Sequence, residues 1–301
     1  RCSQCGIPYC QIHCPLSNNI PDWLKYIAED RLEEAYEVSS STNAFPEVCG
    51  RVCPQDRLCE GNCVVEKAGF GSITIGSLEK HITETAWEKG WIKPITSDQK
   101  QNQKIAIIGS GPAGLAAATY LIEYGYEVEV FEKNDRIGGL MIYGIPNFKL
   151  DKSVVLRRSD WLKESGVIFH TNCEIGKDIK FEFLEKKFDA ILISTGVYKA
   201  RSLDFNTDKV NNSIPALEYL IESNKIGLGD KPSPNNHLNA KNKKVLVIGG
   251  GDTAMDCVRT AVRQEASEVI CLYRRNKESM PGSAREVANA EQEGVKFKWL
   301  S

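Results

Sequence analysis

Several features are scarce or missing in this chain of 301 residues. It has no apolar run approaching the ~20 residues that span a bilayer, which excludes a membrane-spanning protein. Its 38 basic and 40 acidic residues nearly cancel, to a net charge of −2, so nucleic acid is not expected as a partner. Hydrophobic residues make up 42% and charged residues 26%, which is typical of a folded protein of about two domains.

The chain also lacks an initial methionine. It begins at Arg1, inside a cysteine motif, and ends in the strand-like stretch VKFKWLS. We therefore expect a polypeptide that is truncated at both ends, in which no targeting signal can be judged.

Residues 1–100 lack the alternating pattern of β-strands. Apolar residues recur at helical spacing in NNIPDWLKYIAEDRLEEAYEVSS, residues 18–40, and GSLEKHITETAWEKG predicts another helix, capped by Ser77 and ended by Gly90. The polar stretch KPITSDQKQNQ that follows is predicted to be a linker.

From Lys104 onward the pattern becomes strand, glycine turn, helix and strand, which is the βαβ unit of a parallel sheet. It occurs at KIAIIG and again at KKVLVIG, about 140 positions later. The sequence therefore predicts an α/β protein in which a helical, cysteine-rich domain over residues 1–100 precedes two Rossmann-like dinucleotide-binding domains with parallel sheets. We place these two domains at residues 101–200 and 201–301.

The first glycine turn, GSGPAG, has the G-x-G-x-x-G spacing between a strand and a helix. Its glycines permit a tight turn, approach of a pyrophosphate and close helix packing, while the helix N-terminus favours the phosphates. Glu132 ends the next strand, where a carboxylate accepts hydrogen bonds from a ribose diol and repels a 2′-phosphate, so we expect FAD or NAD. The alternative is a purely structural turn. The predicted contacts are Gly109, Gly111, Pro112, Ala113, Gly114 and Glu132.

The second glycine turn, GGGDTA, has alanine at the third position, an accepted variant of the pattern. The next strand ends in Arg274 and Arg275, and guanidinium groups match a phosphate bidentately. This module should therefore prefer NADP(H), although two arginines on a solvated strand end are the alternative. The predicted turn contacts are Gly249, Gly250, Gly251, Asp252, Thr253 and Ala254.

Two further segments could run past a flavin. RIGGLMIYGIP contains Gly139 and Leu140, and ISTG contains Thr195 and Gly196 at the end of a strand. Either could equally be an ordinary loop. FAD beside NADPH in one chain would indicate hydride transfer from nicotinamide to flavin.

Cysteine is the residue that the chain has in excess. Eight of its 11 cysteines lie in the first 63 residues, spaced C-x2-C-x4-C-x3-C-P and C-x3-C-P-x4-C-x3-C. A disulfide scaffold needs an oxidising compartment, whereas the rest of the chain looks like a cytosolic nucleotide-binding enzyme, so we expect a cytoplasmic protein. A tight run of cysteines with a last one before proline is typical of ferredoxin clusters, in which that last cysteine often ligates the other cluster.

Eight thiolates match two 4Fe–4S clusters. By the crossover pattern, one cluster takes Cys2, Cys5, Cys10 and Cys63, and the other takes Cys14, Cys49, Cys53 and Cys59. Zinc stays an alternative, although only one pair has the C-x-x-C spacing that zinc sites favour. The other three, Cys173, Cys257 and Cys271, are predicted to be core thiols.

Seven stretches together resemble the small-subunit family of bacterial NADPH-dependent glutamate synthases: CSQCGIPYCQIHCP, NNIPDWLK, FPEVCGRVCPQDRLCEGNC, IGSLEK, IIGSGPAGLAAA, GGLMIYGIPNFKL, and VIGGGDTAMDCVRTAVRQ followed by YRR and MPGSAREV. The resemblance implies that NADPH reduces FAD and that electrons pass through 4Fe–4S clusters to a large subunit, which forms glutamate from glutamine and 2-oxoglutarate. It also implies the crossover ligation, with all eight cysteine positions matched.

The resemblance leaves two matters open. The family's FAD domain resumes after the NADPH domain with a glycine-rich segment that this sequence lacks, and no general acid or base is named, so catalytic residues stay unassigned. Dihydropyrimidine dehydrogenase and ferredoxin:NADP transhydrogenase subunits have a similar front half, so another electron acceptor is the alternative function.

Overall fold

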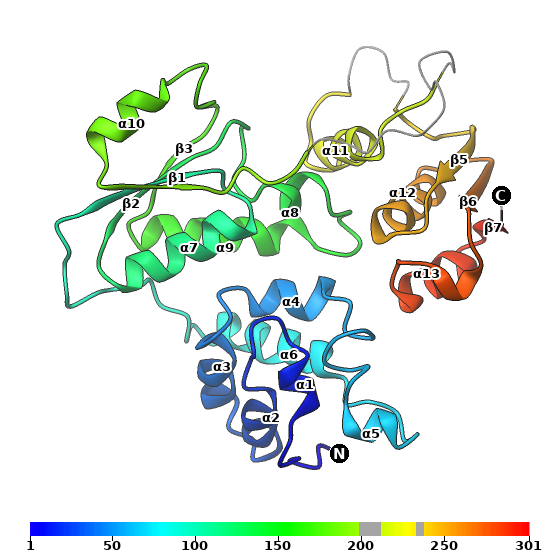
Figure 1. Ribbon diagram of the computed structural model, residues 1–301, viewed down its shortest axis with the longest axis horizontal. Helices are drawn as coiled ribbons and strands as arrows, with labels where there is room; N and C mark the ends of the chain where they lie inside the picture. The colour runs from blue at the N-terminus through cyan, green and yellow to red at the C-terminus, as the bar shows by residue number, and fades with distance from the viewer. Residues whose placement is uncertain (199–211, 233–237, 301) are drawn as a thin grey trace. The chain divides into compact units, whose positions relative to one another are not determined.

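The computed structural model describes residues 1–198, 212–232 and 238–300. Contacts divide the chain into two compact units: Arg1–Met141 with Lys149–Gly196, and Ile142–Phe148 with Val197–Ser301 (Figure 1). The predicted boundary between residues 200 and 201 lies outside the described residues. Within the described ranges, no helix is long and apolar enough to cross a membrane.

The front of the first unit is helical, as the absence of alternation predicted. Its core contains Trp23, Ile75 and Ile82, which are almost completely buried. The Trp23 indole donates to Asn18 Oδ1 at 2.7 Å, which satisfies its buried N–H. The helices are α1 Tyr9–Ile12, α2 Ile20–Ala28, α3 Leu32–Ser40, α4 Pro46–Val52, α5 Val64–Lys67 and α6 Ile75–Glu88.

Two local predictions in this region need correction. The periodic stretch 18–40 forms two helices, because Asp30 adopts a φ of +58° and the chain turns there. Ser77 lies inside α6, whose N-cap is Thr74, so the predicted cap was wrong. Gly90, with a φ of +67°, follows the C-cap of α6 as predicted.

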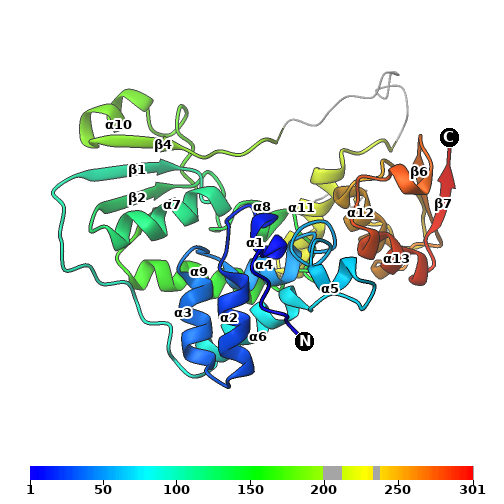
Figure 2. The same cartoon turned by 60° about the horizontal axis from the view of Figure 1, so that its bottom comes forward.

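The first unit continues into a parallel sheet with strand order β3-β2-β1-β4. Helix α7 covers one face and α10 the other, as Figures 1 and 2 show; on the α10 side, Leu184 and Phe188 pack with Ala106 and Phe131. The elements are β1 Lys104–Ile108, α7 Pro112–Glu123, β2 Glu127–Phe131, α9 Lys152–Glu164, β3 Ile168–His170, α10 Phe181–Lys187 and β4 Ala190–Ile193. The short helix α8, Leu140–Tyr143, spans the point where the chain passes between the units.

The second unit contains a parallel sheet of order β5-β6-β7. Helices α12 and α13 pack on it around a core that includes Met255, Val258 and Cys271. The segment 142–148 belongs to this unit: Asn224 donates to the Tyr143 carbonyl at 2.9 Å. The elements are α11 Ala216–Gly227, β5 Lys244–Ile248, α12 Asp252–Arg263, β6 Glu268–Tyr273, the 3-10 helix η2 Lys277–Ser279, α13 Ala284–Gln292 and β7 Lys296–Trp299.

The fold class is therefore the predicted one, with a helical front followed by two βαβ-based sheets. Of the three cysteines expected in the core, Cys257 and Cys271 are buried. Cys173 lies in a loop after β3 and is half-buried, packed against the core cluster that contains Leu184 and Phe188, so it borders the core.

Candidate functional site

The first glycine turn joins β1 to α7. Gly109 has a φ of +104°, and a Cβ there would lie 2.5 Å from the Ser194 carbonyl oxygen, so only glycine fits. A Cβ on Gly114 would lie 2.0 Å from the Gly109 carbonyl oxygen, whereas one on Gly111 would meet nothing within 4 Å. The backbone at Gly111 and the exposed Pro112 and Ala113 thus form an open helix N-terminus, the arrangement that suits a pyrophosphate.

Glu132 follows β2 and is 4% exposed. Its Oε2 accepts from the Ser110 N–H at 3.0 Å and hydroxyl at 2.6 Å, and its Oε1 accepts from the Asn134 N–H at 2.9 Å and side-chain amide at 2.7 Å. These four donors use about all the lone pairs that a carboxylate offers. A ribose hydroxyl at Glu132 would have to replace one of them, and the two side-chain donors can rotate away. Sequence reasoning missed Ser110, although its place between two turn glycines was a signal.

The loop that contains Gly139 packs directly on the first glycine turn. The Gly138 N–H donates to the Ser110 carbonyl and hydroxyl, both at 3.1 Å. A Cβ on Gly139, whose φ is +52°, would lie 2.7 Å from Gly111 Cα. Leu140 follows in α8 and is half-buried. The structure thus brings this predicted loop to the first glycine turn.

Thr195 and Gly196 follow β4, next to the turn. The Ser194 hydroxyl bonds the carbonyl oxygens of Ile108 and Gly109 at 3.1 and 3.0 Å, which ties this strand end to the turn. Thr195 and Gly196 are both exposed, so they are accessible to a ligand.

The second glycine turn joins β5 to α12 and is covered by a loop that sequence reasoning missed. The Gly282 N–H donates to the Gly250 carbonyl at 2.8 Å, and the Ser283 N–H donates to Asp252 Oδ1 at 2.9 Å. Gly249 has a φ of +140°. Gly251 is the N-cap of α12, and the first residues of that helix are Asp252, exposed Thr253 and buried Ala254.

Arg274 and Arg275 follow β6 and are exposed. Among the described residues, neither guanidinium takes part in an ion pair. By contrast, Arg259 and Arg263 on α12 are paired with Glu293 at 2.8 and 2.7 Å. The strand-end arginines are therefore accessible cations beside the second turn, whereas the α12 arginines are structural.

Four of the eight front cysteines converge on one small pocket. Cys2, Cys5, Cys10 and Cys63 all line it, although Cys63 lies more than fifty positions after the others. The pKa of Cys10 is raised to about 11. Burial is the largest cause of this rise, and the neighbouring Cys63 and Cys2 thiols add to it. This set is the first predicted ligand group, and we call it the first cysteine group.

The other four front cysteines also lie close together. A hydrogen bond with Cys53 and burial both raise the pKa of Cys49. Burial raises the pKa of Cys59 to about 12, with a smaller contribution from the Cys14 thiol. Glu79 interacts electrostatically with both Cys49 and Cys59, so the Cys49–Cys53 pair and the Cys14–Cys59 pair share a neighbour. We call Cys14, Cys49, Cys53 and Cys59 the second cysteine group.

All 11 cysteines are free thiols. Over residues 1–198, 212–232 and 238–300, no three Cys, His, Asp or Glu side chains converge closely enough to hold a single metal ion. Tetrahedral zinc, with bonds of ~2.3 Å, would bring its sulfurs to within ~3.8 Å of one another. A 4Fe–4S cluster takes one sulfur at each of its four irons, so each group of four cysteines has the number of ligands that one cluster needs.

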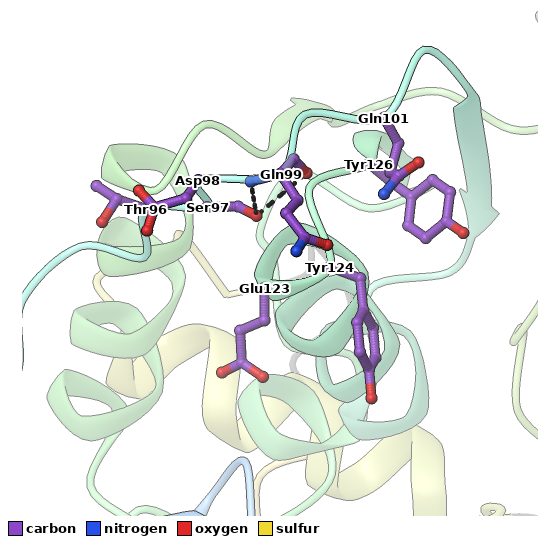
Figure 3. Close-up of a pocket in the computed structure, with 8 residues that line it drawn as sticks. All are labelled: Thr96, Ser97, Asp98, Gln99, Gln101, Glu123, Tyr124 and Tyr126. Atoms are coloured by element: carbon purple, nitrogen blue, oxygen red, sulfur yellow. Dashed lines mark hydrogen bonds between the residues drawn. The ribbon is translucent and has the colours of Figure 1, made fainter.

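A separate surface hollow of about 560 Å³ lies where the predicted linker packs on the end of α7 (Figure 3). The Gln101 N–H donates to the Gly125 carbonyl at 2.9 Å. The titratable side chains that line this hollow are Asp98, Glu123 and two tyrosines, and none of the lining residues is a cation. The hollow therefore does not suit a phosphate-bearing ligand, and the linker is held against the first sheet domain.

Two protein-family models match this chain, one over the cysteine-rich helical region and one over the two sheets with their glycine turns. Residues 1–91 match the family model described as dihydropyrimidine dehydrogenase domain II, 4Fe-4S cluster, and residues 103–301 match that described as pyridine nucleotide-disulphide oxidoreductase. The chain is 59% identical, over 99% of its length, to the glutamate synthase [NADPH] small chain of Azospirillum brasilense, of which it covers 62%. It is 44% identical to the putative oxidoreductase UacF of Escherichia coli, over 99% of this chain and 47% of that protein.

The predicted resemblance to glutamate synthase small chains is thus confirmed, and the chain spans about three-fifths of the Azospirillum relative. Among solved structures, FprA of Mycobacterium tuberculosis in complex with NADPH matches 64% of this chain and 48% of its own, with a TM-score of 0.53 and 20% identity, which shows a shared fold. Because the pyridine nucleotide model covers about two-thirds of the chain, from the first glycine turn through the second, the chain belongs to the pyridine nucleotide-disulphide oxidoreductase family.

Proposed function

We propose that this chain is the electron-input part of an NADPH-dependent glutamate synthase, which binds FAD, NADPH and two 4Fe–4S clusters. The observation that carries the proposal is the match to the Azospirillum small chain, which runs through both cysteine groups and both glycine turns at 59% identity. Bound FAD would supply acceptance of a hydride from NADPH and release of single electrons toward the clusters, which explains why one chain would combine these groups.

The first module would hold FAD. The open backbone at Gly111 and the N-terminus of α7 favour a pyrophosphate, and Gly139 keeps the neighbouring loop close without a side chain in the way. Glu132 would orient the ribose, and its negative charge disfavours a 2′-phosphate. Thr195 and Gly196 are exposed beside the turn and would contact the bound group.

The second module would hold NADPH. The N-terminus of α12, from Gly251 to Ala254, would face the pyrophosphate. Arg274 and Arg275 would pair with the 2′-phosphate, and their accessible guanidinium groups support this role. We assign no general acid or base, because hydride transfer needs none.

The two cysteine groups would each hold one 4Fe–4S cluster. The convergence of Cys63 with Cys2, Cys5 and Cys10 supports the crossover set, because neither sequence run supplies those four alone. The match of residues 1–91 to the 4Fe-4S family model favours clusters over zinc. Reduced thiols fit a cytoplasmic protein.

The electrons would leave for a large subunit that forms glutamate from glutamine and 2-oxoglutarate. The alternative is a related oxidoreductase with another acceptor, of the dihydropyrimidine dehydrogenase or ferredoxin:NADP transhydrogenase kind. The 44% identity to the putative oxidoreductase UacF supports that alternative, because it extends over the same 99% of the chain.

Anaerobic purification of the full-length polypeptide tests the proposal. We expect ~8 iron atoms per chain, bound flavin and NADPH oxidation, with glutamate formed only when the large subunit is added. A colourless product that contains zinc would refute the cluster assignment. Retained iron and NADPH oxidation without glutamate formation in the presence of the large subunit would favour the alternative acceptor.

A further inference from the structure

The two cysteine groups lie in different surroundings. Exposure does not separate the two groups, because Cys2, Cys5 and Cys10 are half-buried and Cys63 is buried, whereas all four cysteines of the second group are half-buried. None of the described side chains that line this pocket carries a charge at neutral pH apart from the cysteines themselves; apolar ones include Leu24, Val65 and Ile73. The difference lies in the lining, because no acidic or basic side chain among the described residues lines the pocket of the first group.

A hydrogen-bond donor points at a sulfur of the first group. The Gln4 side-chain amide donates to Cys2 Sγ at 3.3 Å and to the Pro21 carbonyl at 2.9 Å. Gln4 adopts a φ of +49°, in the left-handed region that non-glycine residues seldom occupy. Because the second bond occupies the same amide nitrogen, the donor is held in place beside the sulfur.

The second group has a buried carboxylate beside it. Glu60 directly follows Cys59, is 5% exposed and acts on the Cys59 thiol electrostatically. Its Oε1 accepts from the Gly76 N–H at 3.0 Å, in the first turn of the 14-residue helix α6. The N-terminus of a helix stabilises an ionised carboxylate, so Glu60 supplies a fixed negative charge.

An acceptor also faces a sulfur of the second group. Asn43 Oδ1 lies 3.7 Å from Cys49 Sγ and accepts from the Phe45 N–H at 3.0 Å, while the Asn43 amide nitrogen donates to Glu79 at 3.0 Å. These two bonds fix the amide orientation with its oxygen toward the sulfur. The Glu79 carboxylate is itself buried, so two buried carboxylates, Glu60 and Glu79, border the second group.

We propose that the first cysteine group holds its cluster at a higher reduction potential than the second. The inference rests on the proposed function, in which each group binds a 4Fe–4S cluster. Reduction adds one electron, and so one negative charge, to each cluster. The Gln4 N–H donor to sulfur stabilises that charge at the first group, whereas a buried carboxylate and a carbonyl oxygen oppose it at the second. At equilibrium a single electron shared by both sites would reside at the first group.

A redox titration followed by electron paramagnetic resonance tests this in the anaerobic full-length protein, with dithionite as the electron donor. We expect two one-electron steps in the wild type. Glu60→Gln, which keeps an oxygen for the Gly76 N–H, should raise only the lower step, with a tenfold change in the reduced-to-oxidised ratio, or ~59 mV. Gln4→Leu should lower only the higher step. Glu66→Gln is the matched control, because Glu66 is near Cys63 in sequence but exposed, and should move neither.

The outcomes separate this inference from the function on which it rests. A wild-type protein without iron would refute the proposed function and the inference with it. Full iron content, with Glu60→Gln moving the higher step or with neither test variant moving any step, would overturn the inference alone. If Glu60→Gln loses iron, the result for Gln4→Leu decides the matter. A decrease in the lower reduction potential, or no shift in either, would contradict the assignment of the higher potential to the first cysteine group.

Discussion

Arg158 on α9 and Glu47 on α4 form an ion pair with side chains 4% and 0% exposed. The contact is bidentate, with Nε–Oε1 at 2.7 Å and Nη2–Oε2 at 2.8 Å. The guanidinium also lies 5.2 Å from the Trp87 ring centre and 4.7 Å from that of Trp161. Arg158→Met keeps much of the side-chain volume but leaves the Glu47 carboxylate buried without its partner.

The expected loss follows from that burial. Breaking a buried ion pair from one side costs about 3–5 kcal/mol, because the remaining charge stays out of water. In a unit of this size each kcal/mol lowers the melting temperature by about 2–4 °C, so we expect a fall of roughly 6–20 °C. The measurement is thermal unfolding by circular dichroism, without oxygen.

Two companion variants make the result decisive. Lys163→Met removes the exposed Lys163–Asp160 pair of the same helix, where each side chain is more than half exposed, and should cost about 0–1 kcal/mol. Glu47→Leu combined with Arg158→Met should recover part of the loss, because no buried charge remains. Equal melting temperatures for Arg158→Met and Lys163→Met, or no recovery in the double variant, would refute the reasoning.

Three further predictions address the other modules. Replacing Arg274 and Arg275 with alanine should raise the Kd for NADPH at least tenfold and change that for NADH little, because only NADPH has the 2′-phosphate; equal losses in titrations of both nucleotides would contradict the role. Gly139→Ala should release bound FAD, measured by flavin absorbance, because its Cβ would lie 2.7 Å from Gly111 and φ is positive; normal flavin content would count against the packing argument. Burial alone would raise the pKa of Glu293, but hydrogen bonds and charges from two α12 arginines outweigh burial and hold it at about 2. Its stabilisation is therefore complete above the unfolded value near 4.5 and is lost as pH falls toward 2, so the gap in melting temperature between wild type and Glu293→Gln should close over that range.

The glycine turns were predictable because their requirements are local. A strand, three spaced glycines and a helix describe one stretch of chain, and the steric limits at Gly109 and Gly114 follow from that stretch and the strand beside it. The two sheets followed from the same repeated pattern. The cap at Ser77 was mispredicted because a serine near a helix start satisfies the pattern whether it lies at the cap or one turn inside.

Contacts between distant residues were not predictable in this way. Arg158 and Glu47 are 111 positions apart, and nothing in either local sequence indicates that both side chains are buried. Likewise, Ser283 bonds Asp252 over the second turn from 31 positions away. Such pairs depend on how whole elements pack, which periodicity does not encode.

Helix α4 contains both a residue that the local sequence identified and a residue whose role depends on a distant contact. It carries Glu47, which the packing of α9 holds, and Cys49, which the cysteine spacing identified. Seven residues are too few for a helix to be stable alone, so its position depends on tertiary contacts. Helix α4 packs chiefly on α6 of the same helical region, and the Arg158–Glu47 pair adds a buried contact to α9. The position of Cys49 therefore depends on the packing of α4 against α6 and α9, and not on the cysteine motif alone.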